Sequence, residues 1–175
     1  MKLTKILLPL ATLVAAGAIA VGSGATFTST STNTISSVTA GTLSQSNSKA
    51  NAAVFNLTNI KPGDVANGSL TITNTGSLPA RFSLTETAST NTFTGSNLTL
   101  VITNTTTNKV VYTGAFGGLA DGAPQDLGLV NPRVANNFTF SVKLDQATPN
   151  TDQGKTATAA FKWDSVQESG TTTNQ

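Results

Sequence analysis

Residues 53–89 read AVFNLTNIKPGDVANGSLTITNTGSLPARFSLTETAS and contain three short stretches in which apolar and polar side chains alternate. The stretches cover residues 53–58, 70–73 and 81–85, and a period of two is typical of a β-strand with one buried face. Residues 61–64, KPGD, separate the first two stretches and favour a tight turn, because Pro fixes φ and Gly tolerates positive φ. The sequence therefore predicts an antiparallel β meander of three strands joined by two turns.

Further alternating segments lie on both sides of this meander. Residues 98–103 and 109–113 predict a hairpin, and residues 138–145 and 156–163 each place one apolar face opposite a polar one. The apolar face of residues 156–163 carries Trp163, which we expect to pack in the core because of its large apolar area. A short strand is also predicted before the meander, at residues 38–43. The segments between strands are rich in Ser, Thr, Asn or Gly and therefore predict loops, which cover residues 44–51, 87–96, 114–124 and 145–154.

The number and spacing of these segments decide the fold class. Eight or nine short strands without a helical period predict an all-β protein, an antiparallel two-sheet sandwich of jelly-roll-like form. We expect this β-sandwich domain to cover residues 38–168, with residues 169–175 as a disordered tail. Such a sandwich has edge strands, and an unpaired edge is a template for another chain.

The start of the chain has the layout of a cleaved secretory signal peptide. Two lysines precede an apolar run over residues 6–21, and small residues follow it. We expect cleavage after Ala25, or after Gly24, so that residues 1–25 form the signal peptide. The alternative is a retained membrane anchor, for which the run is short and interrupted by Pro and Gly.

Residues 26–37, TFTSTSTNTISS, form a segment that differs from the rest. Thr has a high β propensity, but Phe27 and Ile35 are the only large apolar residues that the segment could bury. The sequence is therefore compatible with a disordered leader, with a strand that pairs within its own subunit, or with a strand that needs a partner.

Composition excludes several functions. The chain has 175 residues, no Cys and no His, so a secreted domain must rely on its core and its sheets, without disulfides. The net charge of +2 includes Lys2 and Lys5 of the signal peptide, which leaves eight basic against eight acidic residues (10 − 2 = 8 against 8). A neutral chain lacks the basic surface that nucleic-acid binding requires.

The sequence predicts no catalytic, cofactor-binding or metal-binding residue. A zinc peptidase of the His-Glu-x-x-His type needs histidines on a helix, and a serine nucleophile needs a basic partner. Two alternatives remain at the level of single residues. The first is that loop acids bind Ca²⁺, and these acids are Asp121, Asp126, Asp145 and Asp152. The second is a Lys–Asn isopeptide bond, which needs a buried Lys beside an acid, and its strand candidates are Lys143, Lys162 and Glu86.

Several of these motifs, in their order, resemble the TasA/camelysin family of secreted proteins, which includes bacterial biofilm-matrix fibre subunits and archaeal bundling pili. The similarity rests on NIKPGD at residues 59–64 and GSLTITNTGSLPA at residues 68–80. It extends to GATFT at residues 24–28, TAGTL at residues 39–43, and Gly-Lys at residues 154–155 before the last strand.

The resemblance implies a jelly-roll fold, processing by a dedicated signal peptidase, and export to the extracellular matrix or the cell surface. It also implies that residues 26–37 act as a donor strand that enters a neighbouring subunit, with Thr26, Phe27, Thr28 and Ile35 in the contact. The expected function is a subunit that polymerises head-to-tail into fibres, with itself and an anchor or minor fibre protein as partners. The alternatives are a monomeric adhesin that binds a ligand through loops 87–96 and 114–124, and a camelysin-type metallo-endopeptidase.

Overall fold

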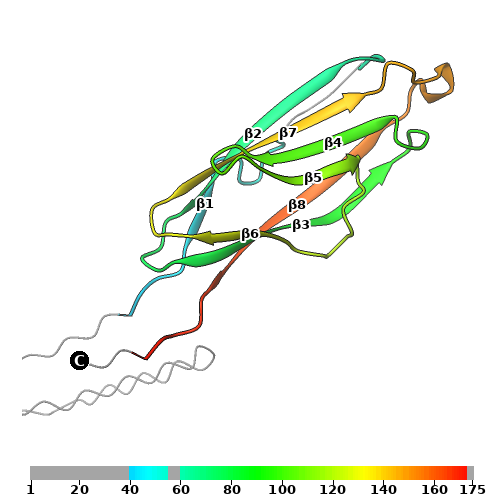
Figure 1. Cartoon of the computed structure of the whole chain (residues 1–175). Coiled ribbons are helices and arrows are strands. Elements are labelled where there is room, and N and C mark those ends of the chain that lie inside the picture. Colours follow the sequence, from blue (N-terminus) through cyan, green and yellow to red (C-terminus); the bar gives the residue numbers. More distant parts are fainter. Residues whose placement is uncertain (1–39, 55–59, 173–175) are drawn as a thin grey trace, which may run out of the picture. The chain divides into compact units, whose positions relative to one another are not determined.

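The computed structural model describes residues 40–54 and 60–172 (Figure 1). Residues 41–169 form one compact unit. The fold described below is that of this unit.

The described residues of this unit form β-strands and a single short 3₁₀-helix at Asn150–Asp152. Period-two burial is clearest in β7, where every second residue from Asn136 to Leu144 is buried. The strands of the described residues are β1 (Gln45–Asn47), β2 (Val65–Asn74), β3 (Ala80–Asn91), β4 (Leu98–Asn104), β5 (Lys109–Ala115), β6 (Gln125–Val130), β7 (Ala135–Leu144) and β8 (Ala157–Gln167).

The strands build two antiparallel sheets, which confirms the predicted all-β sandwich. One sheet has five strands in the order β1-β2-β7-β4-β5, and the other has three in the order β6-β3-β8 (Figure 1). The predicted hairpin is also confirmed, because β4 and β5 are paired from Thr99 opposite Ala115 to Asn104 opposite Lys109, with a register shift between Ile102 and Thr103.

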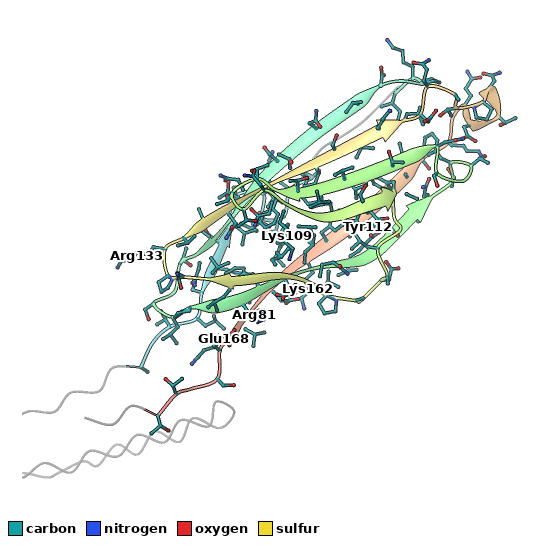
Figure 2. All side chains as sticks on the ribbon, in the orientation of Figure 1. Arg81, Lys109, Tyr112, Arg133, Lys162 and Glu168 are labelled. Atoms are coloured by element: carbon teal, nitrogen blue, oxygen red, sulfur yellow. The ribbon has the colours of Figure 1, made fainter. Side chains whose placement is uncertain are left out.

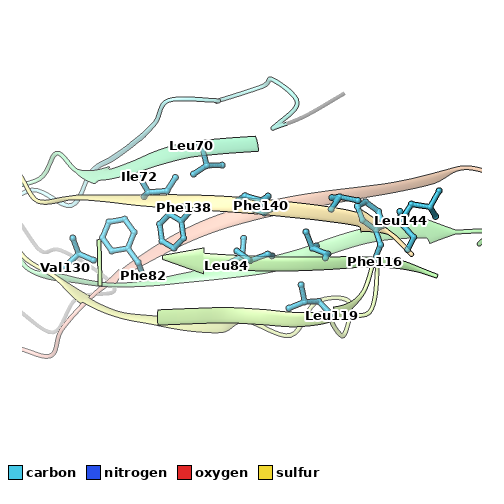
Figure 3. Packing of buried hydrophobic residues seen from close by; sticks show 14 of the residues in the cluster. Leu70, Ile72, Phe82, Leu84, Phe116, Leu119, Val130, Phe138, Phe140 and Leu144 are labelled. Carbon is cyan, nitrogen blue, oxygen red and sulfur yellow. The ribbon is translucent and has the colours of Figure 1, made fainter. Parts of the chain in front are cut away.

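The core lies between the two sheets (Figure 3). Phe140 of β7 and Leu84 of β3 come from opposite sheets and are both completely buried. Burial of a side chain of this size contributes about 1.5 to 3 kcal/mol, so the core is the main source of stability in a chain without disulfides. Trp163 packs against this cluster from β8, as predicted, and remains half-buried.

The predicted meander is wrong in its pairing. β2 pairs with β1 and β7, whereas β3 belongs to the other sheet and pairs with β6 and β8. The chain changes sheet at Asn74, whose buried side-chain amide donates to the carbonyls of Leu78 and Val130 and whose side-chain oxygen accepts from the Gly76 N–H. Alternation shows that a strand has a buried face, but it does not show which strand lies beside it. The first predicted strand lies mostly outside the described residues.

The predicted strand at residues 38–43 is also wrong where it is described, because residues 40–43 form no strand. The first strand is instead β1, which lies inside the predicted loop 44–51 and pairs with β2. Its three residues are polar and largely exposed, so backbone pairing, without a hydrophobic pattern, positions it.

The predicted loop 87–96 is shorter than expected. β3 continues to Asn91 with a β-bulge between Glu86 and Ala88, and its last residues pair with the start of β8. Thr and Ser in this segment have the β propensity that a pairing strand needs, which outweighs their frequency in loops. Similarly, β5 takes Gly114 and Ala115 from the predicted loop 114–124.

Candidate functional site: an open strand edge beside an apolar groove

β8 is an edge strand of the three-stranded sheet, and in the described part of the chain it pairs with β3 alone. The Thr156 carbonyl, just before β8, accepts from the Thr92 N–H on the β3 side, whereas the Trp163 carbonyl accepts from the Gln45 side chain at 2.8 Å on the opposite side. Backbone groups of alternate residues in an antiparallel strand point to the same side. The backbone groups of Ala157, Ala159 and Phe161 therefore face the free edge, as those of Trp163 do.

The side chains of Ala157, Ala159 and Phe161 line a groove of about 1170 Å³, which we call the β8 groove. Its apolar lining comes from both sheets and from the chain on either side of residues 55–59, which lie outside the described ranges. The residues that define it are Val54, Ile60, Phe93, Ala157, Ala159 and Phe161.

The groove exists because the sheets differ in width and β8 carries small residues. Along β8, Ala157 and Ala159 remain half-buried, in contrast to the fully buried inward residues of β7. Only at Phe161 and Trp163 do large rings reach across, to Phe140 and Phe138 at centroid distances of 5.4 and 4.7 Å. An additional strand along residues 157–161 would therefore find both unpaired backbone groups and apolar surface.

Asp152 organises the wall of the groove near the start of β8. Its carboxylate accepts hydrogen bonds from the Thr94 N–H (3.1 Å), the Thr94 hydroxyl (2.7 Å) and the Asn97 amide (2.8 Å), and it pairs with Lys155 at 2.8 Å. These contacts join the loop after β3 to the turn before β8.

The same contacts determine the charge state of Asp152. Its pKa lies well below the usual range of Asp, chiefly because of the hydrogen bond from Asn97, followed by those from Lys155 and Thr94. Asp152 is therefore ionised at every physiological pH and serves as a fixed anchor for the loop that carries Phe93.

The residues predicted to act in assembly lie outside the described residues. They are the donor-segment residues Thr26, Phe27, Thr28 and Ile35 and the cleavage-site residues Gly24 and Ala25. The structure consequently describes the surface that could accept a strand and leaves the donor segment as a prediction.

The loop acids considered for Ca²⁺ do not come together. Asp126 pairs with Arg81 at 3.0 Å on the outer face of the three-stranded sheet, where Arg81 also contacts Glu168 at 3.3 Å (Figure 2). Asp145 accepts from the Ala147 N–H, and Asp152 is used as described above. The pKa of Asp126 is lowered, first by the Gly128 N–H and then by Arg81.

The residues considered for an isopeptide bond differ in their exposure to solvent. Lys143 is exposed, and Lys162 is exposed and pairs with Asp164 at 2.9 Å, so both lysines point outward as expected. Glu86 is completely buried, and no ion pair of the described residues includes it.

Sequence reasoning missed two features of this region. Phe93 lies in a stretch of Thr, Ser and Asn, where a single aromatic residue was the only signal of a buried contact. Ala157 and Ala159 were predicted to face the core, but their small size, which leaves the groove open, was not used. No helix of the described residues is long and apolar enough to cross a membrane.

Comparison with known proteins identifies a family. Residues 4–97 match the family model described as Camelysin metallo-endopeptidase, and this match covers more than half of the 175 residues. No curated protein matches the chain.

The donor atoms of this chain do not fit the metal that the family description implies. The sequence has neither His nor Cys, and its eight Asp and Glu residues all lie within the described ranges. Among these described residues, no three acidic side chains lie close enough to hold a metal ion. A catalytic zinc site requires three protein ligands, usually including His, and an acid–base group beside them.

Proposed function

The chain belongs to the camelysin/TasA family, and on this premise we propose that the protein is an exported structural subunit that polymerises head-to-tail into extracellular fibres. The observation that carries this proposal is the free edge of β8 beside the β8 groove. Strand addition needs both features, because backbone hydrogen bonds supply affinity and side-chain pockets supply specificity.

The donor in this proposal is the segment of residues 26–37 of a neighbouring subunit. Phe27 and Ile35 are eight residues apart, an even number, so an extended segment places both on one face. The residues between them on that face are Ser or Asn, which are small enough to pass over Ala157 and Ala159.

This contact would be heterologous, because the donor segment and the acceptor groove are different surfaces. Each subunit that gives a strand keeps its own groove free for the next subunit, so the contact propagates as a filament. Export and cleavage after Ala25 or Gly24 act as the switch in this scheme, since they release the amino-terminal end of the donor. An anchor or minor fibre protein would begin the filament.

A peptidase activity receives no support from the residues of this chain, for the reasons of ligand chemistry given above. The direct test is incubation of the purified mature chain with casein, with and without chelator. Digestion that persists through purification and is abolished by the chelator would establish the peptidase. A monomeric adhesin would instead remain monomeric at every concentration.

Negative-stain microscopy of the chain that begins at Thr26 tests the proposal. We expect concentration-dependent filaments from this chain and only monomers from a chain that begins at Val38. A synthetic peptide of residues 26–37, added in excess, should shorten the filaments because it fills the terminal grooves. Filaments of normal length from the chain that begins at Val38 would refute donor-strand assembly.

A further inference from the structure

Glu86 of β3 is completely buried, and among the described residues neither of its carboxylate oxygens has a hydrogen-bond partner. It lies at the β-bulge where β3 shifts its register against β8. A buried carboxyl group without partners is rare in folded proteins and is costly when charged. The charge of the Glu86 carboxylate must therefore be neutralised, either by a proton or by a bound cation.

The groups around Glu86 supply no cation. Burial raises the pKa of Glu86, and the negative charge of Asp121 raises it further. The Ser89 hydroxyl and the Leu119 N–H partly oppose these effects, without reaching the carboxylate in good hydrogen-bond geometry. The ion pairs formed among the described residues all use other acids.

Tyr112 of β5 lies beside the glycine-rich segment that follows this strand, because a Cβ added to Gly118 would lie 2.5 Å from the Tyr112 hydroxyl. Its pKa is raised first by burial and then by the charge of Glu86, and its hydroxyl donates to the Ala115 carbonyl at 2.7 Å. Tyr112 is the only tyrosine of the chain, so a single substitution separates its optical signal from that of Trp163.

A glycine-rich loop between β5 and β6 covers Glu86. The Gly122 N–H donates to the Glu86 backbone carbonyl at 2.9 Å, and the Ser89 hydroxyl donates to the Gly117 carbonyl at 3.3 Å. Gly117 has a φ of +70°, and a Cβ added to it would lie 2.9 Å from the Ser89 hydroxyl and 3.7 Å from Oε1 of Glu86. Only glycine permits this close approach.

We propose that Glu86, Asp121, the Ser89 hydroxyl and the Gly117 carbonyl bind a hard divalent cation of the Ca²⁺ class. Carboxylate, hydroxyl and carbonyl oxygens are the ligands that Ca²⁺ prefers, and Asp121 is exposed and directly precedes Gly122, whose N–H is bonded to the Glu86 backbone carbonyl. The cation would compensate the buried charge and fix the loop onto β3. This site is structural, it lacks the ligands of a peptidase, and it is independent of fibre assembly.

Terbium luminescence tests the proposal with the chain that begins at Val38, which keeps the whole compact unit of residues 41–169. Tb³⁺ replaces Ca²⁺ in oxygen sites, and excitation of Tyr112 should produce terbium emission that excess Ca²⁺ suppresses. We also expect Ca²⁺ to raise the melting temperature of this chain. Glu86→Gln should weaken Ca²⁺ competition at least tenfold, and Asp121→Asn, at an exposed position that should not disturb folding, should also weaken it.

Two matched variants complete the test. Asp145→Asn removes an exposed loop acid elsewhere and should leave the emission unchanged, whereas Tyr112→Phe should reduce the emission to the part that Trp163 sensitises and keep the shift in melting temperature. No response of the unmodified chain to either ion would overturn the proposal. Equal responses of the unmodified chain and of both Glu86→Gln and Asp121→Asn would overturn it as well.

Discussion

The indole ring of Trp163 lies against the phenyl ring of Phe138, with ring centroids 4.7 Å apart and ring planes inclined by 57°. The pair joins β8, an edge of the three-stranded sheet, to β7 at the centre of the five-stranded sheet. Tilted aromatic pairs of this kind are favourable beyond the area that they bury. β8 is thus attached to the core at Trp163 and opens into the β8 groove nearer its start.

Trp163→Ala should destabilise the domain by about 3 kcal/mol, at the lower end of the range for such truncations because the side chain is half-buried. Urea unfolding followed by circular dichroism measures the change. Val166→Ala, at a position of the same strand that is 65% exposed, should change stability by less than about 0.5 kcal/mol. Equal effects of the two substitutions would show that the indole does not hold the sheets together.

Asp152→Asn should lower the urea midpoint at pH 7, because it removes the charge that Lys155, Asn97 and Thr94 stabilise. The pKa of Asp152 is lower in the folded chain than in the unfolded chain, so its contribution is complete above about pH 4. The difference between the two chains should therefore shrink as the pH falls below 4.

Asp164→Asn is the control for this prediction. Asp164 makes an exposed ion pair with Lys162, and such pairs contribute little to stability. A difference for Asp152→Asn that stays constant from pH 7 to pH 2 would contradict the proposed role of its charge.

Glu86→Gln should have the opposite dependence on pH when divalent cations are removed with a chelator. The pKa of Glu86 is raised by burial, so the unmodified chain loses stability as the pH rises above the unfolded value of about 4.3. The amide variant cannot ionise and should become progressively more stable than the unmodified chain as the pH rises above this value. Glu168→Gln, at the other, exposed glutamate, should lack this trend, and parallel stability curves for Glu86→Gln and the unmodified chain would argue against a buried charge.

Ala159→Glu should prevent assembly, because it places a carboxylate in the β8 groove, where an incoming strand would remove it from water. Ala160→Glu is a matched control, since the neighbouring side chain points to the opposite, exposed face of β8. We expect the concentration needed for filaments to rise at least tenfold for the first variant and to stay within twofold for the second. The same concentration for both would exclude the groove as the contact.

The buried faces of the central strands could be predicted from sequence because large apolar side chains alternate there. Four large apolar residues of β7 alternate with polar residues in the sequence, and all four are buried in the structure: Phe138, Phe140, Val142 and Leu144. This pattern needs no knowledge of neighbouring strands. The pattern is sufficient to predict the fold class and to predict which face of each strand is buried.

Strand pairing could not be predicted in the same way. Asn74 redirects the chain into the second sheet through hydrogen bonds to Leu78 and Val130, and Val130 lies 56 residues further along the chain. β1 carries no hydrophobic pattern at all. These features depend on contacts between distant residues, which local alternation does not record.

The candidate site was predictable in part. The sequence indicated a β-prone donor segment and an edge that would accept it, but the choice of β8 depends on which strand lies outermost. Glu86 was recognised as the sole acidic residue among the strand candidates for an isopeptide bond. Its complete burial follows from the β-bulge and from the glycine-rich loop above it, which the alternation of β3 does not reveal.

Sedimentation velocity of two complementary chains tests head-to-tail assembly through β8 most directly. One chain begins at Val38 and has only the acceptor groove, and the other begins at Thr26 and carries Ala159→Glu, so that it has only the donor segment. Each chain alone should sediment as a monomer, and an equimolar mixture should form a one-to-one dimer without filaments. Monomers alone in the mixture, or filaments from the chain that begins at Val38, would contradict the proposed assembly.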